Sequence, residues 1–100
     1  MIAVKKPLFN IGQVVATPGA IEALERAKVA PWELISRHVA GDWGIVDSED
    51  TEFNNEALKD GSRILSAYKL ATGEKLWIIT EAEDECGNRA ATSILRPEEY

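Results

Sequence analysis

The segment "SRILSAYKLATGEKLWIITE", residues 62–81, decides the fold class of this chain. Its two halves are rich in β-branched and aromatic residues, which favour strands. Between them lies the turn sequence ATGE, residues 71–74, in which Gly73 can adopt the positive φ that a short hairpin turn requires. The segment therefore predicts two antiparallel strands joined by a tight turn.

Strand patterns also lie on both sides of this hairpin. Downstream, the sequence RAATSILRP of residues 89–97 follows an acidic turn over residues 83–88, and Pro97 ends the pattern. Upstream, the sequence LFNIGQVVAT of residues 8–17 alternates as a strand does, and Gly12 marks a bulge or a close backbone approach. Four strands are therefore predicted, with the first at an edge or in the middle of the sheet.

Three helices are predicted between the first two strands. Thr17 can cap the free amides of the first helix, and Pro18 suits its first position. The second helix opens at Pro31, and the third runs from about Asp47 to Gly61. The resulting order, β-α-α-α-β-β-β, predicts an α+β domain with an antiparallel sheet and helices packed on one face.

We expect one domain over residues 8–100, preceded by a loose leader over residues 1–7, because a chain this short builds a single core. The residues expected to form most of that core are Ile21, Leu24, Trp32, Ile35, Val39, Phe53, Leu65, Leu76, Ile78 and Ile94.

The composition limits the functions open to this domain. A net charge of −6 argues against direct nucleic-acid binding, which Lys and Arg drive. No apolar run reaches the roughly 18 to 20 residues that cross a bilayer. The lone Cys86 has no partner within the chain for a disulfide, and one histidine with one cysteine cannot form a zinc site. We therefore expect a cytoplasmic protein that needs no metal and, without a Gly-rich phosphate loop, no cofactor.

His38 is the candidate catalytic residue, since it is the only histidine in the chain. A carboxylate at Glu33 or Asp42 could tune its pKa for general-base chemistry. The alternative is a structural histidine near the end of a helix, where the imidazole meets the last carbonyls. We favour the structural alternative, because no glycine-flanked serine accompanies His38.

Trp43, in the sequence GDWG of residues 41–44, is a candidate for partner binding. Its flexible neighbours could hold the indole at the surface as an anchor, or the indole could plug the core between the second and third helices. The plug is favoured. Acidic residues follow this turn and could steer a basic partner, or they could simply form a solvated helix face. They are Asp47, Glu49, Asp50 and Glu52.

Tyr68 and Trp77 in the hairpin complete the predicted protein-binding site. Three helices can cover only one sheet face, so part of the hairpin's apolar surface could remain exposed for a partner. The alternative is that the leader or the C-terminal tail folds over this surface.

The sequence also resembles a family of short, uncharacterised proteins of bacterial plasmids, phages and integrative elements. The phrases that carry the resemblance are IGQVVATPGAIEALERA, SRHVAGDWG, GSRILSAY, GEKLWIITEA and TSILRPEEY, which span residues 11–100 in the same order. Some members are labelled as type I restriction subunit M, but this chain has neither a Gly-rich cofactor loop nor an Asn-Pro-Pro-Phe-type tetrapeptide. It also departs from the family in a longer turn, EDECGNRAA, at residues 83–91.

Two hypotheses for function follow. The first is a non-enzymatic interaction protein of a mobile genetic element. Its role would be counter-defence by binding a host protein, and it could also form a homodimer. The second is a small metal-independent nuclease or toxin-like enzyme, in which His38 would act with Arg63 or Arg89. The convergence of His38, Arg63 and Arg89 on one cleft would distinguish the second hypothesis from the first.

Overall fold

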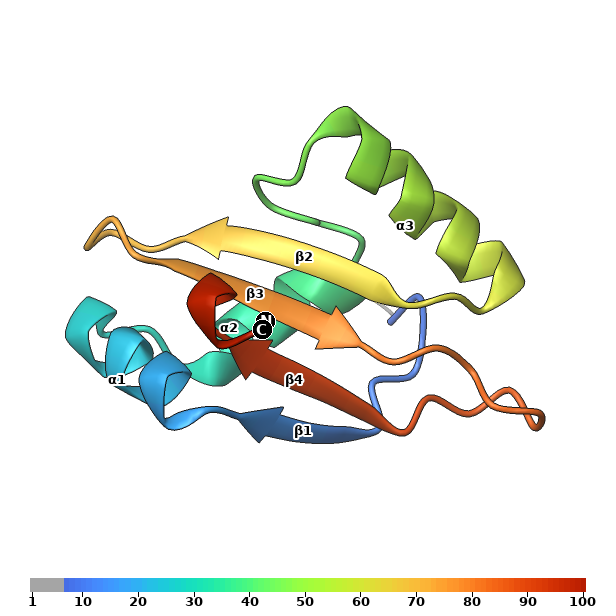
Figure 1. The fold of residues 1–100 in the computed structure, drawn as a ribbon, viewed down its shortest axis with the longest axis horizontal. Helices are drawn as coiled ribbons and strands as arrows, with labels where there is room; N and C mark the ends of the chain where they lie inside the picture. Colours follow the sequence, from blue (N-terminus) through green and yellow to red (C-terminus); the bar gives the residue numbers. More distant parts are fainter. Residues whose placement is uncertain (1–6) are drawn as a thin grey trace, which may run out of the picture.

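A computed structural model of the protein describes residues 7–100, so the predicted leader lies outside the described residues except for Pro7. The elements in chain order are β1 (Gln13–Ala16), α1 (Pro18–Ala27), α2 (Pro31–Val39), α3 (Ser48–Asp60), β2 (Ile64–Lys69), β3 (Lys75–Thr80), β4 (Ala91–Leu95) and the 3₁₀ turn η1 (Pro97–Glu99), as Figure 1 shows. The predicted α+β class and element order are confirmed. Within residues 7–100, no helix is long and apolar enough to span a bilayer.

The sheet has the strand order β1-β4-β3-β2. Strands β2, β3 and β4 form the predicted antiparallel meander. Strand β1, however, pairs with β4 in parallel, so the sheet is mixed and the expectation of a purely antiparallel sheet is wrong. A parallel neighbour requires a long crossover connection. The chain has one here, because three helices and two further strands separate β1 from β4.

Strand β1 is shorter than predicted, and just before it, at Gly12, the backbone passes close to the residues that precede β4. That glycine has a φ of +60°, and a Cβ there would lie 2.3 Å from the Arg89 carbonyl oxygen. Only a residue without a side chain permits this approach. The prediction of a close backbone contact at Gly12 is therefore confirmed.

The two faces of the sheet have different coverings. The face we call the helix face carries Ile64, Ser66, Tyr68, Leu76, Ile78, Thr80, Thr92 and Ile94. Helices α1 and α2 pack against it, and their Ala20, Ala23, Leu24 and Leu34 join the same core cluster. The opposite face, which we call the open face, carries Val15, Leu65, Ala67, Trp77, Ile79, Ser93 and Leu95. Figure 1 shows α2 behind the sheet, η1 in front of it, and α3 along the edge formed by β2.

The core is only partly the one predicted. Leu24, Leu76, Ile78 and Ile94 are buried as expected, and Ile35, Val39 and Leu65 are half-buried. The prediction of burial is wrong for Ile21, Trp32 and Phe53, whose side chains are 45%, 68% and 71% exposed.

Each helix is rotated about its axis from the predicted orientation. Helix α1 turns Ala23 inward, α2 turns Leu34 and His38 inward, and α3 turns Asn54 and Ala57 inward. Alanine lets a helix approach its neighbour closely, and a polar residue can be buried when its hydrogen bonds are satisfied. Apolar size alone was therefore a poor guide to the buried side of these helices.

The predicted helix starts are confirmed by their capping bonds. The Thr17 hydroxyl accepts from the Ala20 amide at 3.1 Å, and the Asp47 carboxylate accepts from the Asp50 amide at 2.8 Å. At the other end of α3, Gly61 adopts the left-handed conformation that closes a helix.

Candidate functional site

His38 lies inside the protein and belongs to a chain of hydrogen bonds across the helix face. Its Nδ1 lies 2.5 Å from the Ser66 hydroxyl, and its Nε2 lies 2.8 Å from the Thr80 hydroxyl. Thr80 lies 2.7 Å from the Thr92 hydroxyl, which donates to the carbonyl of Ile11. The chain thus runs from β2 to the segment that precedes β1.

The direction of this chain fixes the tautomer of His38. Because Thr92 donates its only proton to Ile11, it must accept the proton of Thr80. Thr80 must then accept from Nε2–H of His38. In the neutral imidazole, Nδ1 therefore accepts from the Ser66 hydroxyl, and both ring nitrogens are engaged.

The surroundings of His38 keep it neutral. Burial and, to a smaller extent, the positive charge of Arg89 together lower its pKa from 6.5 to about 4. The side chain is fully buried, and the rings of Phe9 and Trp43 lie 5.1 and 6.0 Å from it. These contacts agree with the structural alternative, in which His38 is a core residue.

His38, Arg63 and Arg89 do not share a cleft. Arg89 is buried and donates to the carbonyls of Ser62 and Glu81 at 2.8 and 2.9 Å. Arg63 instead donates to the Tyr100 hydroxyl. The three side chains therefore do not converge, although Arg89 and His38 both contact the Phe9 ring.

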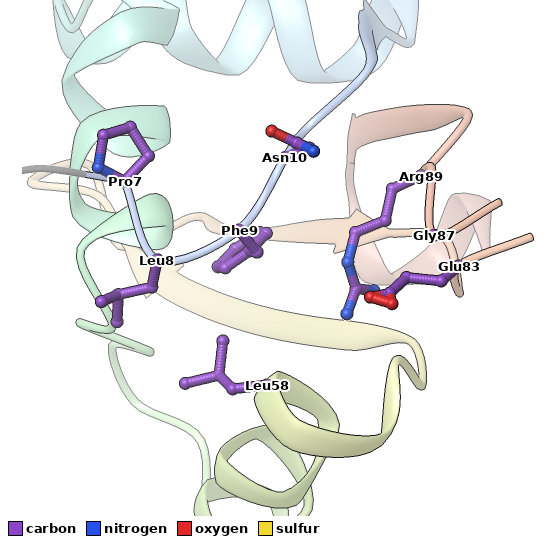
Figure 2. A pocket seen from close by; sticks show the side chains of 8 residues that line it. All are labelled: Pro7, Leu8, Phe9, Asn10, Leu58, Glu83, Gly87 and Arg89. Atoms are coloured by element: carbon purple, nitrogen blue, oxygen red, sulfur yellow. The ribbon is translucent and has the colours of Figure 1, made fainter.

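A pocket of about 460 Å³ opens beside Arg89. Figure 2 shows Leu8, Phe9 and Leu58 on one side of it and Arg89 with Glu83 on the other. The guanidinium of Arg89 also donates to the Ala57 carbonyl near the end of α3, so it links α3 to the other residues of the pocket wall. With a cation and a carboxylate on the same wall, the pocket selects no ligand charge.

Trp43 plugs the core between α2 and α3. It packs with Ala57 and Ile64, and its indole N–H donates to the Asn55 side chain at 3.3 Å. Its carbonyl accepts from the Ala67 amide, which fixes the turn against β2. The plug alternative is therefore confirmed, and Trp43 offers no anchor on the surface.

Tyr68 is also absent from the predicted binding surface. It lies on the helix face, almost fully buried, and its hydroxyl donates to the Asp42 carbonyl at 2.6 Å. Burial raises the pKa of this hydroxyl to about 12. Trp77 faces the other way, because it pairs with Ala67. The two hairpin aromatics therefore cannot form one patch.

Of the predicted aromatics, Trp77 alone remains on the open face, where it is half-buried. The Tyr100 ring lies 5.6 Å from it, and the hydroxyl of Tyr100 accepts from Arg63. Sequence reasoning missed Tyr100, which could have been found only by knowing where the last residues pack.

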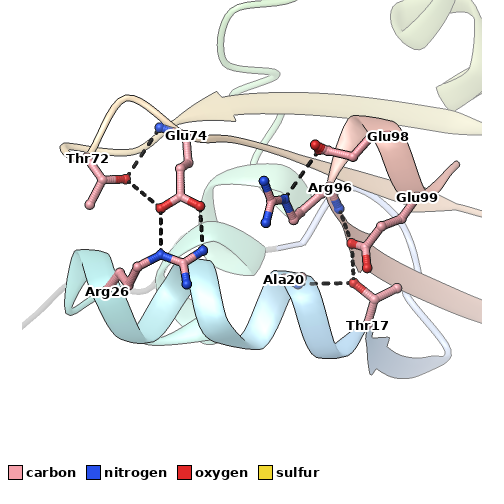
Figure 3. Close-up of polar contacts among 8 residues, drawn as sticks. All are labelled: Thr17, Ala20, Arg26, Thr72, Glu74, Arg96, Glu98 and Glu99. Atoms are coloured by element: carbon pink, nitrogen blue, oxygen red, sulfur yellow. Dashed lines mark hydrogen bonds and ion pairs between the residues drawn. The ribbon is translucent and has the colours of Figure 1, made fainter.

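The segment that carries Tyr100 is tied to the start of α1. The Glu99 carboxylate accepts from the Thr17 hydroxyl at 2.6 Å and from the Arg96 amide at 2.8 Å (Figure 3). These bonds lower the pKa of Glu99 below its usual value. The C-terminal tail therefore covers part of the open face. This agrees with the alternative in which the tail folds over the apolar surface of the hairpin.

A second tie fixes the hairpin to α1. Arg26 binds Glu74 with two hydrogen bonds of 3.0 and 2.6 Å, and Thr72 adds a third to the same carboxylate (Figure 3). The bond to Arg26 lowers the pKa of Glu74 to about 2.

The predicted acidic residues lie at the surface around the start of α3. Asp47, Glu49 and Glu52 are exposed, Asp50 is half-buried, and Asp47 serves as the helix cap. Within the described part of the chain, no three His, Cys, Asp or Glu side chains are grouped so that they could hold a metal ion.

Comparison of the chain with protein-family models, curated proteins and solved structures gives no match. The resemblance to proteins of mobile elements therefore stays a prediction.

Proposed function

We propose that this protein is a non-enzymatic interaction protein that binds a protein partner through its open face. The observation that carries the proposal is a pair of exposed apolar side chains at this face, whose Ala67, Ile79 and Leu95 are themselves buried. Val15 is about half-exposed on the face, and Tyr100 stands out over Trp77. Exposed apolar surface of this kind is typical of interaction sites, where aromatic residues contribute most of the binding free energy.

Phe53 extends this surface at the edge of the sheet. The neighbouring Asn54 bonds the outward amide and carbonyl of Leu65 at the edge formed by β2, so Phe53 lies beside that edge. Phe53 is the most exposed large apolar residue of those described.

The charge of the protein favours a basic partner. The net charge is −6, and Asp47, Glu49 and Glu52 lie exposed on the same helix as Phe53. Such a field accelerates the approach of a positively charged surface, while the apolar contacts hold the complex. We propose counter-defence on a mobile element as the role, with a basic host protein as the target.

The test compares two exposed aromatic residues on different surfaces. Phe53→Ser and Trp32→Ser each remove a side chain that is about 70% exposed, at 71% and 68%, but Trp32 belongs to α2 behind the sheet. Protein captured from host lysate should fall at least about tenfold for Phe53→Ser, since hot-spot residues contribute that much, and should be unchanged for Trp32→Ser. Equal capture by both variants would contradict the proposal.

A separate assay tests the enzymatic alternative. Purified protein is incubated with RNA and DNA, beside the His38→Gln variant. Cleavage that is lost in the folded His38→Gln variant would overturn the proposal in favour of the nuclease.

A further inference from the structure

Strand β1 leaves one edge of the sheet open. It bonds to β4 through alternate residues, as shown by Gln13 N–H to Ala90 O at 3.1 Å and Thr17 N–H to Ile94 O at 3.0 Å. In a parallel ladder the residues between these point their amides and carbonyls the other way. Val14 and Ala16 therefore present four polar groups outward, and within residues 7–100 no element lies beside β1 on that side.

Apart from its short length, strand β1 lacks the features that usually protect an edge. Many natural edge strands carry Lys, Pro or a bulge. Residues 13–16 contain neither Lys nor Pro and keep an unbroken register with β4. Moreover, no charged residue occurs between Lys6 and Glu22, in a chain where 28% of residues are charged.

We propose that this edge pairs with β1 of a second copy of the protein. Antiparallel pairing around a twofold axis at Val15 places Val14 opposite Ala16 of the second copy. Every outward amide and carbonyl of both strands then has a partner, and Val15 lies opposite Val15. The edge is thus complementary to itself.

The distribution of charge favours a second copy of the protein over a basic partner at this edge. Two molecules with a net charge of −6 repel each other over most of their surface. The segment from residue 7 to residue 21 is where they can approach without like charges in contact. A basic partner, in contrast, would gain nothing from an uncharged strand.

The dimer should be weak. A contact of four residues per copy falls below the roughly 1,000 Å² that stable interfaces bury. Val15 lies on the open face, so the pairing would join the open faces of both copies on one side of a continuous sheet.

Cysteine crosslinking tests the register. In a Cys86→Ser background, which removes the exposed native thiol, Val15→Cys should give a disulfide-linked dimer under mild oxidation. Facing residues in such a pair have Cα atoms about 4.5 to 5.5 Å apart, within disulfide range. Val14→Cys is the matched control, because it is 43% exposed against 44% for Val15. The Cα atoms at position 14 of the two copies in the dimer would lie more than about 7 Å apart, so the introduced cysteines should not form a disulfide.

Sedimentation tests the association itself. Unmodified protein should shift from monomer to dimer between about 10 μM and 1 mM, the range of weak affinities. Val15→Lys should remain monomeric, since two ammonium groups would face each other, and it should keep its melting temperature. Equal linking of both cysteine variants, or a monomer at every concentration, would overturn the proposal.

Discussion

The two edges of the sheet, at β2 and at β1, differ in whether their outward amides and carbonyls are hydrogen-bonded. At β2 the outward groups are bonded: the Asn54 side chain binds both the amide and the carbonyl of Leu65, at 3.0 and 2.7 Å. The next outward residue, Ala67, binds the Trp43 carbonyl and the Ile45 amide. At β1 the corresponding groups of Val14 and Ala16 face away from the domain. The fold therefore closes one edge with a turn and a buried side chain and leaves the other available.

This difference shows what closing an edge requires. The closed edge depends on a glycine that lets the turn touch β2 and on an amide side chain that mimics a strand. The open edge needs only an absence of charge.

Gly44→Ala should have the largest effect, because it would push the turn away from β2. A Cβ at Gly44 would lie 1.9 Å from the Ala67 carbonyl oxygen, and φ there is +75°. We expect the free energy of unfolding to fall by about 3 kcal/mol or more. The control is Gly73→Ala, at a φ of +91° with open space around it, where urea denaturation should show a loss of about 1 kcal/mol. Similar losses in both variants would mean that backbone conformation, and not the contact with β2, is what Gly44 provides.

Asn54→Ala should come next, because it leaves the part-buried amide and carbonyl of Leu65 without the partners that Asn54 supplies. Each such group costs about 1 to 3 kcal/mol, so we expect a loss of about 2 to 3 kcal/mol in urea denaturation. Asn55→Ala, one position along the same helix, removes only an exposed acceptor for Trp43 and should cost less than about 1 kcal/mol. A smaller loss for Asn54→Ala than for Asn55→Ala would contradict the role of Asn54.

Acid should weaken the hydrogen-bond chain that crosses the sheet between the two edges. The pKa of His38 is about 4 in the folded protein and about 6.5 when unfolded, so the unfolded chain binds the proton first as the pH falls. Stability from this group is complete above pH 6.5 and is lost as the pH falls toward 4. Between pH 6.5 and 5 we expect the free energy of unfolding to drop by about 2 kcal/mol.

The His38→Gln variant isolates this pH effect. Glutamine can bond to both hydroxyls but does not titrate, so its unfolding free energy should be nearly constant between pH 6.5 and 5. Parallel curves for the two proteins would show that other groups cause the pH dependence.

Amide hydrogen exchange should distinguish the edges without any change in stability. The amides of Leu65 and Ala67 are bonded and should exchange slowly, whereas those of Val14 and Ala16 should exchange at rates near those of loops. At high protein concentration the amides of Val14 and Ala16 should become protected if β1 pairs with a second copy. Protection of these two amides at low concentration would indicate a partner within the chain.

The element order and the helix starts could be predicted from the sequence, because they depend on local signals. The hairpin at residues 71–74, the caps at Thr17 and Asp47, and the end of the last strand at Pro97 are each coded within a few residues. Such signals act without knowledge of distant neighbours.

The buried sides of the helices could not be predicted so well. Phe53 is apolar but exposed, whereas Asn54 is polar but buried, because the unpaired edge of β2 supplies two bonds to its side chain. Likewise, His38 is buried because Ser66 and Thr80 meet it from two strands. These partners lie far away in sequence, so helical periodicity contains no signal for them.

The candidate site was predicted in part, for the same reason. Tyr68 and Trp77 were predicted to share one exposed surface, but the register of the hairpin places them on opposite faces, and the sequence did not show which face the helices cover. The position of Tyr100 over Trp77 depends on the path of the chain after Pro97.

The pairing of Gln13 with Ala91 has a consequence for how the chain folds. The β2–β3 hairpin closes a short loop and can form early, whereas β1 must wait for β4 from the far end of the sequence. Substitutions in β1 should then mainly accelerate unfolding and leave the refolding rate nearly unchanged. A Val14→Ala variant that refolded more slowly, with no change in its unfolding rate, would contradict this order. Until β1 docks, β4 is itself the exposed edge, so the growing sheet is most prone to misassociation just before its last strand arrives.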